Sequence, residues 1–249
     1  MLNIATITDY CATFVGYGQW RAPIWFIGIE EAGGKTESAV ASHLETWNQR
    51  NRKILESAPE FYPASGNHAW HDGNAILQPT WAQLIRMYLL SQAKPDSQDA
   101  ILDYQKTRLG AAEGETCLLE LFPLPSPNVA TWNYANWSES AWLRSRQIYE
   151  QHVVNQRISL IRKRIDACRP RVVIFYGDGQ LKYWRQIIGA GTYARPIPHK
   201  LIAHKRDNIV FFITRHPADP KLGHQRDDYF REIARFFCDN YGDLFAGLA

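Results

Sequence analysis

The chain has 249 residues, 45% of them hydrophobic and 21% charged, which is enough to bury a full core and predicts a single domain over residues 1–249. Its net charge of +3 lies well below the basic excess that would by itself demand a nucleic-acid partner, so any DNA-binding patch has to be local. The four cysteines form no Cys-x-x-Cys pair, and there is neither a leader sequence nor an apolar stretch of ~20 residues, which predicts a cytoplasmic protein with reduced thiols and no membrane contact.

The first half of the chain predicts two buried strands separated by helices. Residues 24–29 are a run of β-branched and aromatic residues that ends in a glycine-rich turn, and residues 116–122 are a second such run, which we expect the following prolines to stop. Residues 59–80 are rich in Pro, Gly, Asn and His and predict a long loop. Helices are predicted in three segments: 36–56, 80–92 and 97–109.

The second half continues the alternation, with strands predicted at 171–177 and 208–214. Helices are predicted in three further segments: 139–167, 179–188 and 226–240. Strands that alternate with helices predict an α/β fold of three layers, in which helices cover both faces of a central, mostly parallel four-stranded sheet. Ligands of such sheets bind beyond the carboxyl ends of the strands.

Polar residues of an unusual kind fall at that edge. Glu30 and Glu31 follow the first predicted strand, Glu120 lies within the second, and His216 follows the fourth. Each alone is a weak signal, because a single histidine after a strand is more often structural and glutamates at loop mouths are commonly solvated. Together they predict an acid/base site, since charged groups at the ends of buried strands need a partner, a substrate or water.

Short motifs around these residues occur in a familiar order. The first strand runs into Gly28-Ile29-Glu30-Glu31-Ala32-Gly33, and the last runs into His216-Pro217-Ala218; between them lie 118–127, with its prolines, and 169–177, which ends in glycine. This layout, from residue 24 to about 237, resembles the uracil-DNA glycosylase superfamily. The resemblance implies that superfamily's fold and a DNA glycosylase, which flips a base out of DNA and hydrolyses its N-glycosidic bond to leave an abasic site.

The resemblance also implies catalytic roles without a metal or cofactor. Glu30 stands where many relatives place the residue that handles water, and a carboxylate there would hold the attacking water and stabilise an oxocarbenium-like sugar. Glu31, which stands where a proline is usual, stays open as the alternative. His216 would donate a hydrogen bond to the base oxygen that gains charge as the bond breaks.

Glu120 occupies the position at which the superfamily holds its base-reading Asn. A carboxylate cannot donate to a carbonyl but can accept from an exocyclic amine, so we expect a 5-substituted or glycosylated cytosine as the substrate rather than uracil. Cytosine itself is excluded, because its removal would destroy the host genome. DNA repair and defence against phage with modified pyrimidines both fit. The alternative is that the alignment is off by one residue and Glu120 pairs with an arginine.

Candidate DNA contacts fall in three parts of the sequence. The resemblance implies an intercalation loop at 219–224, with Leu222 as the wedge and the cations Lys221, Arg226 and Arg215 near phosphates. The basic segment 157–171 is more often a solvated helix face than a DNA contact. The aromatic residues available to stack a flipped base are Tyr62, Trp70, Trp132 and Tyr134, although most tryptophans belong to the core.

Rival interpretations remain open. The site would equally suit a small-molecule nucleoside or nucleotide N-glycoside hydrolase or transferase, and a catalytically idle DNA-binding relative is a third class. A DNA enzyme needs the loop around Leu222 and the basic helix, whereas a small-molecule enzyme needs neither. Residues 68–72, with two histidines and one aspartate, are a weak signal for a metal site, and the absent cysteine cluster disfavours an iron–sulfur centre. We expect a monomer that acts on double- or single-stranded DNA.

Overall fold

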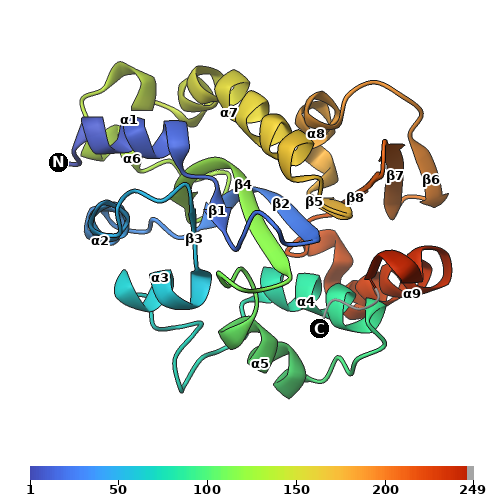
Figure 1. Cartoon of the computed structure of the whole chain (residues 1–249). Helices are drawn as coiled ribbons and strands as arrows, with labels where there is room; N and C mark the ends of the chain where they lie inside the picture. Colours follow the sequence, from blue (N-terminus) through green and yellow to red (C-terminus); the bar gives the residue numbers. More distant parts are fainter. Residues whose placement is uncertain (246–249) are drawn as a thin grey trace.

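A sheet of eight strands runs through the part of the chain that the computed structural model describes, residues 1–245 (Figure 1). The strands are β1 (Gly16–Tyr17), β2 (Ile24–Ala32), β3 (Leu55–Glu56), β4 (Thr116–Ser126), β5 (Val172–Tyr176), β6 (Ala194–Ile197), β7 (Leu201–Arg206) and β8 (Ile209–Thr214). Their order across the sheet is β3-β1-β4-β2-β5-β8-β7-β6.

The prediction of a four-stranded sheet is therefore wrong in number, although its four strands form the centre. β4, β2, β5 and β8 lie side by side and pair in parallel. β1 is antiparallel to β4, and β7 and β6 extend the other side as an antiparallel hairpin. Three of the added strands carry no buried apolar run, because β1 and β3 have two residues each and β6 is largely exposed. The fourth, β7, has such a run only at Leu201, Ile202 and Ala203 before polar residues follow, which is shorter than the pattern that predicts a buried strand.

Helices cover both faces of the sheet, as the three-layer prediction requires. In Figure 1, α1, α7 and α8 lie on one side of the central strands, and α4, α5 and α9 lie on the other. The helices are α1 (Ile4–Thr13), α2 (Glu37–Gln49), α3 (Ala58–Ala64), α4 (Pro79–Ser91), α5 (Gln98–Thr107), α6 (Tyr134–Trp137), α7 (Arg146–Cys168), α8 (Leu181–Ile188) and α9 (Arg226–Phe245). Within residues 1–245, no helix is long and apolar enough to cross a membrane.

Several predicted boundaries move for local reasons. α2 ends at Gln49 rather than near residue 56, because Asn51 and Arg52 adopt left-handed backbone angles that no helix continues through. The predicted loop 59–80 contains α3 at its start. α7 begins at Arg146, where the Ser145 side chain accepts from a helix amide at 3.3 Å.

The prolines after the second predicted strand do not stop it. β4 continues through Pro123 and Pro125 to Ser126. Its neighbour β1 pairs only with Leu118 and Leu119, so beyond that point the strand is paired with β2 alone. A strand with one unpaired side tolerates proline there, because the missing N–H has no partner to lose.

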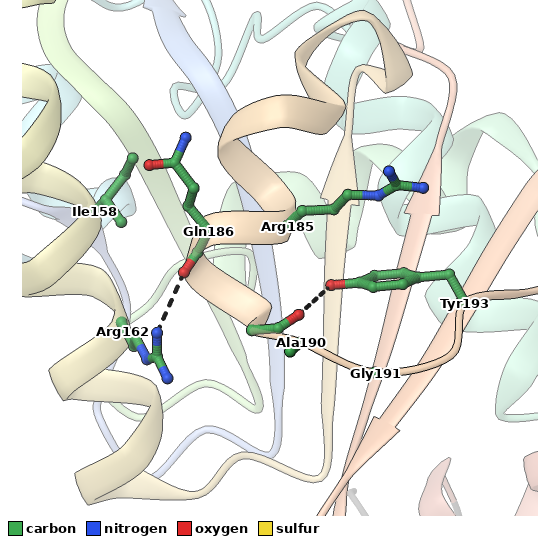
Figure 2. A pocket seen from close by; sticks show the side chains of 8 residues that line it. Ile158, Arg162, Arg185, Gln186, Ala190, Gly191 and Tyr193 are labelled. Carbon is green, nitrogen blue, oxygen red and sulfur yellow. Dashed lines mark hydrogen bonds between the residues drawn. The ribbon is translucent and has the colours of Figure 1, made fainter.

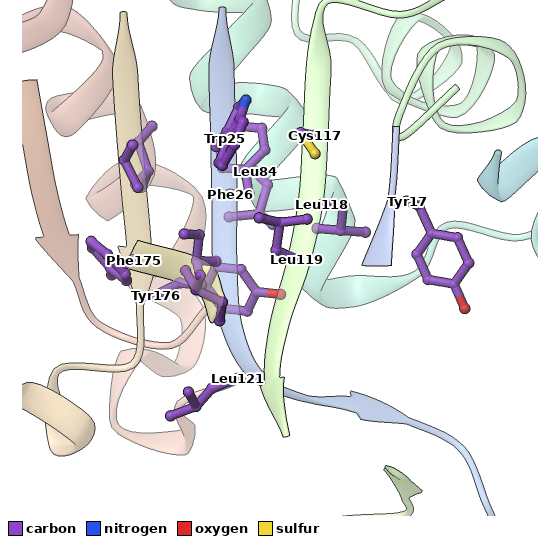
Figure 3. Close-up of a cluster of buried hydrophobic side chains, with 14 of the residues drawn as sticks. Tyr17, Trp25, Phe26, Leu84, Cys117, Leu118, Leu119, Leu121, Phe175 and Tyr176 are labelled. Carbon is purple, nitrogen blue, oxygen red and sulfur yellow. The ribbon is translucent and has the colours of Figure 1, made fainter. Parts of the chain in front are cut away.

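The core fills the space between the central strands and the helices. Trp25, Phe26, Leu119 and Phe175 from three neighbouring strands are each fully buried, and Figure 3 shows them packed together with Leu84 from α4. Buried on both faces, these strands have the continuous apolar character of a parallel sheet.

The strand order locates a crevice. β4 and β5 lie on opposite sides of β2, so the connections that follow β2 and β4 leave in opposite directions. In open α/β sheets, ligands bind outside the carboxyl ends of the strands at such a switch point. The carboxyl end of β2 carries Glu30 and Glu31, which lie within the strand rather than after it.

Candidate active site

A cavity of about 580 Å³ opens at this switch point. Glu30, Glu31, Glu120 and His216, predicted from three separate parts of the chain, all line it. Two of the predicted aromatic residues, Tyr62 and Trp70, line it as well. The structure thus brings the predicted acid/base residues together in one pocket.

Glu30 faces α7, whose first residue is Arg146. The Arg146 guanidinium donates one hydrogen bond to Glu30 Oε2. It also donates to the end of β4, at Ser126 Oγ (2.7 Å), and to the loop that follows, at the Asn128 carbonyl (3.0 Å). Burial raises the pKa of Glu30, and the Arg146 charge opposes that shift. The second oxygen, Oε1, is buried without a hydrogen-bond partner among the described residues, so it is free to act on a ligand.

Glu31 has a different environment, although it is the next residue. Its Oε2 accepts a hydrogen bond from the Tyr17 hydroxyl at 2.8 Å, and its side chain is nearly fully buried. Burial raises the pKa of Glu31 to about 7, against the opposing effect of the Tyr17 hydroxyl. Near neutral pH this carboxyl group therefore exists both as the acid and as the carboxylate.

Glu120 is the third carboxyl group of the pocket. Its Oε1 accepts from the Tyr176 hydroxyl at 2.7 Å, whereas Oε2 is buried without a partner in residues 1–245. Arg157 binds the main-chain carbonyl of Glu120, not its carboxyl group, so the alternative of an arginine pair is wrong for the side chain. A Cβ atom at Gly28 would overlap both the Tyr176 hydroxyl and Glu120 Oε2, which explains why glycine stands there.

Protonation adds a second property to Glu120. Burial raises its pKa well above the ordinary value, against the opposing effect of the Tyr176 hydroxyl. A neutral carboxyl group both donates and accepts, whereas the carboxylate only accepts. The expected role of Glu120 as an acceptor from an amine is thus open to both forms, and the acid can in addition donate to a ring nitrogen or a carbonyl.

His216 is held in one tautomer. Its Nδ1 accepts from the backbone N–H of Ala218 at 3.0 Å, so in the neutral ring Nε2 carries the proton and is the donor. Burial lowers the pKa of His216, and the nearby Asp219 partly opposes that shift. The ring at the pocket wall is therefore a neutral hydrogen-bond donor at pH 7.

Other predicted residues lie away from the pocket. Trp132 donates to the Leu143 carbonyl at 2.7 Å and lies under the Arg146 guanidinium, and Tyr134 is buried with its hydroxyl on the Pro125 carbonyl at 2.9 Å. Neither lines the cavity, which corrects their expected stacking role. Their rings instead support the loop that Arg146 also holds.

Leu222, the expected wedge, is buried away from the pocket. Leu222 is 8% exposed and borders a separate depression together with Arg215 and Lys221. A wedge has to project into DNA, so a buried side chain does not fit that role. Lys221 is exposed and Arg215 lies 3.5 Å from Asp219, whereas Arg226 is half-buried at the start of α9.

The basic segment 157–171 does not reach the pocket either. Arg157 is fully buried and donates to backbone carbonyls, including Leu121 at 2.9 Å, so it braces the core. α7 runs from the pocket towards the amino ends of the strands, where Arg164 lies over Trp20 at 4.8 Å and Arg169 faces Asp207 at 3.6 Å. These arginines are thus at the opposite edge of the sheet.

A wider, open depression lies between α7, α8 and the segment that leads to β6 (Figure 2). Arg162 donates to the Gln186 carbonyl at 3.5 Å, and Arg185 lies 5.1 Å from the centre of the Tyr193 ring. The described residues that line it include no carboxyl group, histidine or thiol. One guanidinium group binds a carbonyl near the carboxyl end of α8 and the other packs on an aromatic ring, so we assign no chemistry to this depression.

Residues 68–72 do not form a metal site. His68 pairs with Asp72 at 2.6 Å, while His71 stacks on Tyr62 with ring centres 5.4 Å apart. Across the described part of the chain, no group of three or more His, Cys, Asp or Glu side chains is arranged to hold a metal ion.

Sequence reasoning missed three residues that control the predicted ones. Arg146, Tyr17 and Tyr176 each bind one of the carboxyl groups. Arg146 and Tyr17 stand in no recognisable motif, and the motif at 169–177, which contains Tyr176, gives that tyrosine no role. Only the tertiary fold brings them near. A buried carboxyl group needs partners, and that requirement is the one signal that could have prompted a search for them.

No family model matches this chain, and no curated protein matches its sequence. The likeness to the uracil-DNA glycosylase superfamily therefore rests on the short motifs, their order and the placement of their residues.

Proposed function

We propose that this protein is a DNA glycosylase of the uracil-DNA glycosylase type, which binds a flipped, modified base in the pocket and hydrolyses its N-glycosidic bond. The observation that carries the proposal is the set of buried, unpartnered oxygen atoms that line one cavity: Glu30 Oε1, Tyr62 Oη and Glu120 Oε2. Buried polar atoms are nearly always hydrogen-bonded, so three such atoms in one pocket call for a polar ligand.

The cleavage step needs a carboxylate and a donor on opposite sides of the bond that breaks. The bond between the sugar C1′ and the base nitrogen cleaves, its electron pair goes to the base, and water adds its oxygen to C1′. The Glu30 carboxylate, the form that the Arg146 charge favours, takes the water proton and stabilises the cationic sugar. His216 Nε2–H donates to the base oxygen that gains charge.

Glu120 supplies base recognition. In its ionised form, Oε2 accepts from an exocyclic amine, and in its neutral form the carboxyl group pairs with an amine and the adjacent ring nitrogen together. Both forms suit the edge of a cytosine. The cavity, at about 580 Å³, lies within the range of ~300–1,000 Å³ typical of sites for larger organic ligands, which favours a base with a substituent.

The test is an abasic-site assay. DNAs that contain uracil, hypoxanthine, 5-substituted cytosine or glucosylated cytosine are incubated with the protein and then cleaved with alkali. We expect strand breaks only with a modified cytosine, and their loss in Glu30→Gln and His216→Ala. The matched control is Glu113→Gln, which makes the same chemical change at an exposed position. Absence of breaks in every DNA, with folded protein, would contradict the proposal.

A second candidate function has its own support. A DNA enzyme was expected to need an exposed Leu222 and a basic helix near the site. The structure has neither, because Leu222 is buried and the arginines in the later part of α7 lie away from the pocket. A hydrolase of small N-glycosides, such as free modified nucleosides, would need neither and would use the same Glu30 and His216 chemistry. Release of base from free nucleosides, at rates equal to or above those with DNA, would favour this function.

A further inference from the structure

One part of the pocket, which we call the second compartment, takes no part in the proposed cleavage chemistry. Four aromatic residues that line it form a contiguous group, which we call the aromatic wall: Tyr17, Tyr62, Trp70 and Trp81. Trp70 lies 5.1 Å from Tyr62 and 4.9 Å from Trp81, and Tyr17 lies 5.0 Å from Tyr62, measured between ring centres. The carboxyl group of Glu31 belongs to the same compartment through its bond to Tyr17.

Carboxyl groups outnumber basic side chains in the lining of the pocket. Its described lining contains five carboxyl groups and neither lysine nor arginine; the five are Glu30, Glu31, Glu120, Asp178 and Asp219. Glu30 and Asp219 have arginine partners outside the lining, namely Arg146 and Arg215. Glu31 and Glu120 are both about nine-tenths buried, and tyrosine hydroxyls are their hydrogen-bond partners.

Such a compartment favours a cation. A buried carboxylate without a positive partner carries a large desolvation cost, which an ammonium group would offset. Aromatic rings attract the same group through their quadrupole, and an aromatic cage is a recurrent binding site for alkylammonium ions. Burial already raises the pKa of Glu31 to about 7, so a bound cation would favour its ionised form.

We propose that the aromatic wall and Glu31 bind a positively charged aminoalkyl substituent on the base, so that the substrate is a pyrimidine with an ammonium-bearing side chain. This inference rests on the proposed function, because it takes the base itself to lie between Glu30 and His216. It narrows the substrate class from modified cytosines in general to those whose 5-substituent is cationic. A glucosyl substituent, which is neutral, is then a poor fit.

The test compares substituents that differ in charge. Short single-stranded oligonucleotides carry one cytosine with a 5-aminoallyl group, its N-acetylated form or a glucosylated hydroxymethyl group, and binding is measured by fluorescence anisotropy. We expect the aminoallyl DNA to bind about tenfold more tightly than the acetylated DNA. This comparison uses the wild-type protein, so it stands even where a variant fails to fold.

Two variants locate the effect. Glu31→Gln should abolish the preference for the charged substituent, and Trp70→Leu should reduce it, whereas Glu113→Gln, at an exposed site, should leave it unchanged. Equal or tighter binding of the acetylated or glucosylated DNA would overturn the inference. A preference that survives Glu31→Gln would also overturn it, because the charge would then act elsewhere.

Base release, measured on the same oligonucleotides, separates the two proposals. Release without a charge preference contradicts the cation site and leaves the glycosylase proposal standing. A charge preference that Glu31→Gln abolishes, without release from any DNA, contradicts the glycosylase proposal and leaves the cation-binding compartment standing.

Discussion

The two sides of strand β2 at its carboxyl end present the same chemical group in opposite settings. On the side that faces α7, Glu30 has a guanidinium partner, Arg146. On the side that faces α3, Glu31 has the Tyr17 hydroxyl and the aromatic wall. Successive residues of a strand point to opposite faces, so two adjacent glutamates in the sequence become two separate sites.

This difference shows how two glutamates that line one pocket, Glu30 and Glu31, can have different roles. A full positive charge favours the ionised form of a buried carboxyl group more strongly than a hydroxyl does, although burial raises the pKa of both Glu30 and Glu31. Pairs of titratable groups whose environments differ in this way commonly divide the work of an active site. Glu30 thus suits water activation, and Glu31 suits binding of a group that brings its own charge.

The largest expected effect is that of exchanging the Glu30 carboxyl group for an amide, compared with the same exchange at Glu31. Glu30→Gln should lower the single-turnover rate of base release by ~10³-fold, because it removes both the proton acceptor and the charge that stabilises the sugar cation. Glu31→Gln should lower the rate by less than ~10-fold with a substrate whose substituent is neutral, since that carboxyl group lies outside the cleavage step. The opposite order would exchange the roles assigned to the two residues.

Removal of the Arg146 guanidinium leaves Glu30, like Glu31, without a positively charged partner. Arg146→Met should lower base release at pH 7 by ~10²-fold, because the pKa of Glu30 would rise further and the carboxylate would be less populated. The acidic limb of the pH–rate profile should move to higher pH, and activity should recover partly as the pH rises. Arg144→Met, at an exposed position two residues earlier, is the control. An unshifted profile would mean that Arg146 only supports the loop after β4.

Stability should depend on pH through Glu31. Its pKa is about 7 in the folded protein and 4.5 in the unfolded chain, so the folded state retains a proton that the unfolded state releases between these values. The free energy of unfolding should therefore fall as the pH rises from 4.5 to 7, by about 3 kcal/mol from this group alone. Urea denaturation across this range should show the slope in the wild type and a smaller slope in Glu31→Gln. Equal slopes in the wild type and in Glu31→Gln would mean that a group other than Glu31 retains the proton in the folded state.

The central strands and the residues at their ends could be predicted from the sequence. A strand buried on both faces leaves a continuous apolar run, as in residues 24–29 and 208–214, and polar residues directly after such runs stand out. The strand order converts that linear pattern into one edge of the sheet, which is why Glu30, Glu120 and His216 meet in the cavity.

The partners of those residues could not be predicted in the same way. Arg146 lies 116 residues from Glu30 in the chain, and Tyr176 lies 56 residues from Glu120. Nothing in the local pattern distinguishes them from surface arginines or core tyrosines. The prediction of Leu222 as a wedge was wrong for the converse reason. A leucine in a polar loop is expected to be exposed, and only the fold shows that this one is buried.

The smallest expected effect concerns a lysine outside the pocket and decides between the two candidate functions. Lys221 is exposed and follows Pro220, which lines the cavity, whereas the described cavity lining contains neither lysine nor arginine, so phosphates would have to bind at such positions outside the lining. Lys221→Gln should weaken binding to an oligonucleotide a few-fold and lower the slope of log K against log salt by about 1, with binding of a free modified nucleoside unchanged. Lys106→Gln, at a charge on α5 that lies outside the cavity lining, is the comparison. A salt slope near zero in the wild type would mean that no phosphate contacts form, and it would favour the nucleoside hydrolase over the DNA enzyme.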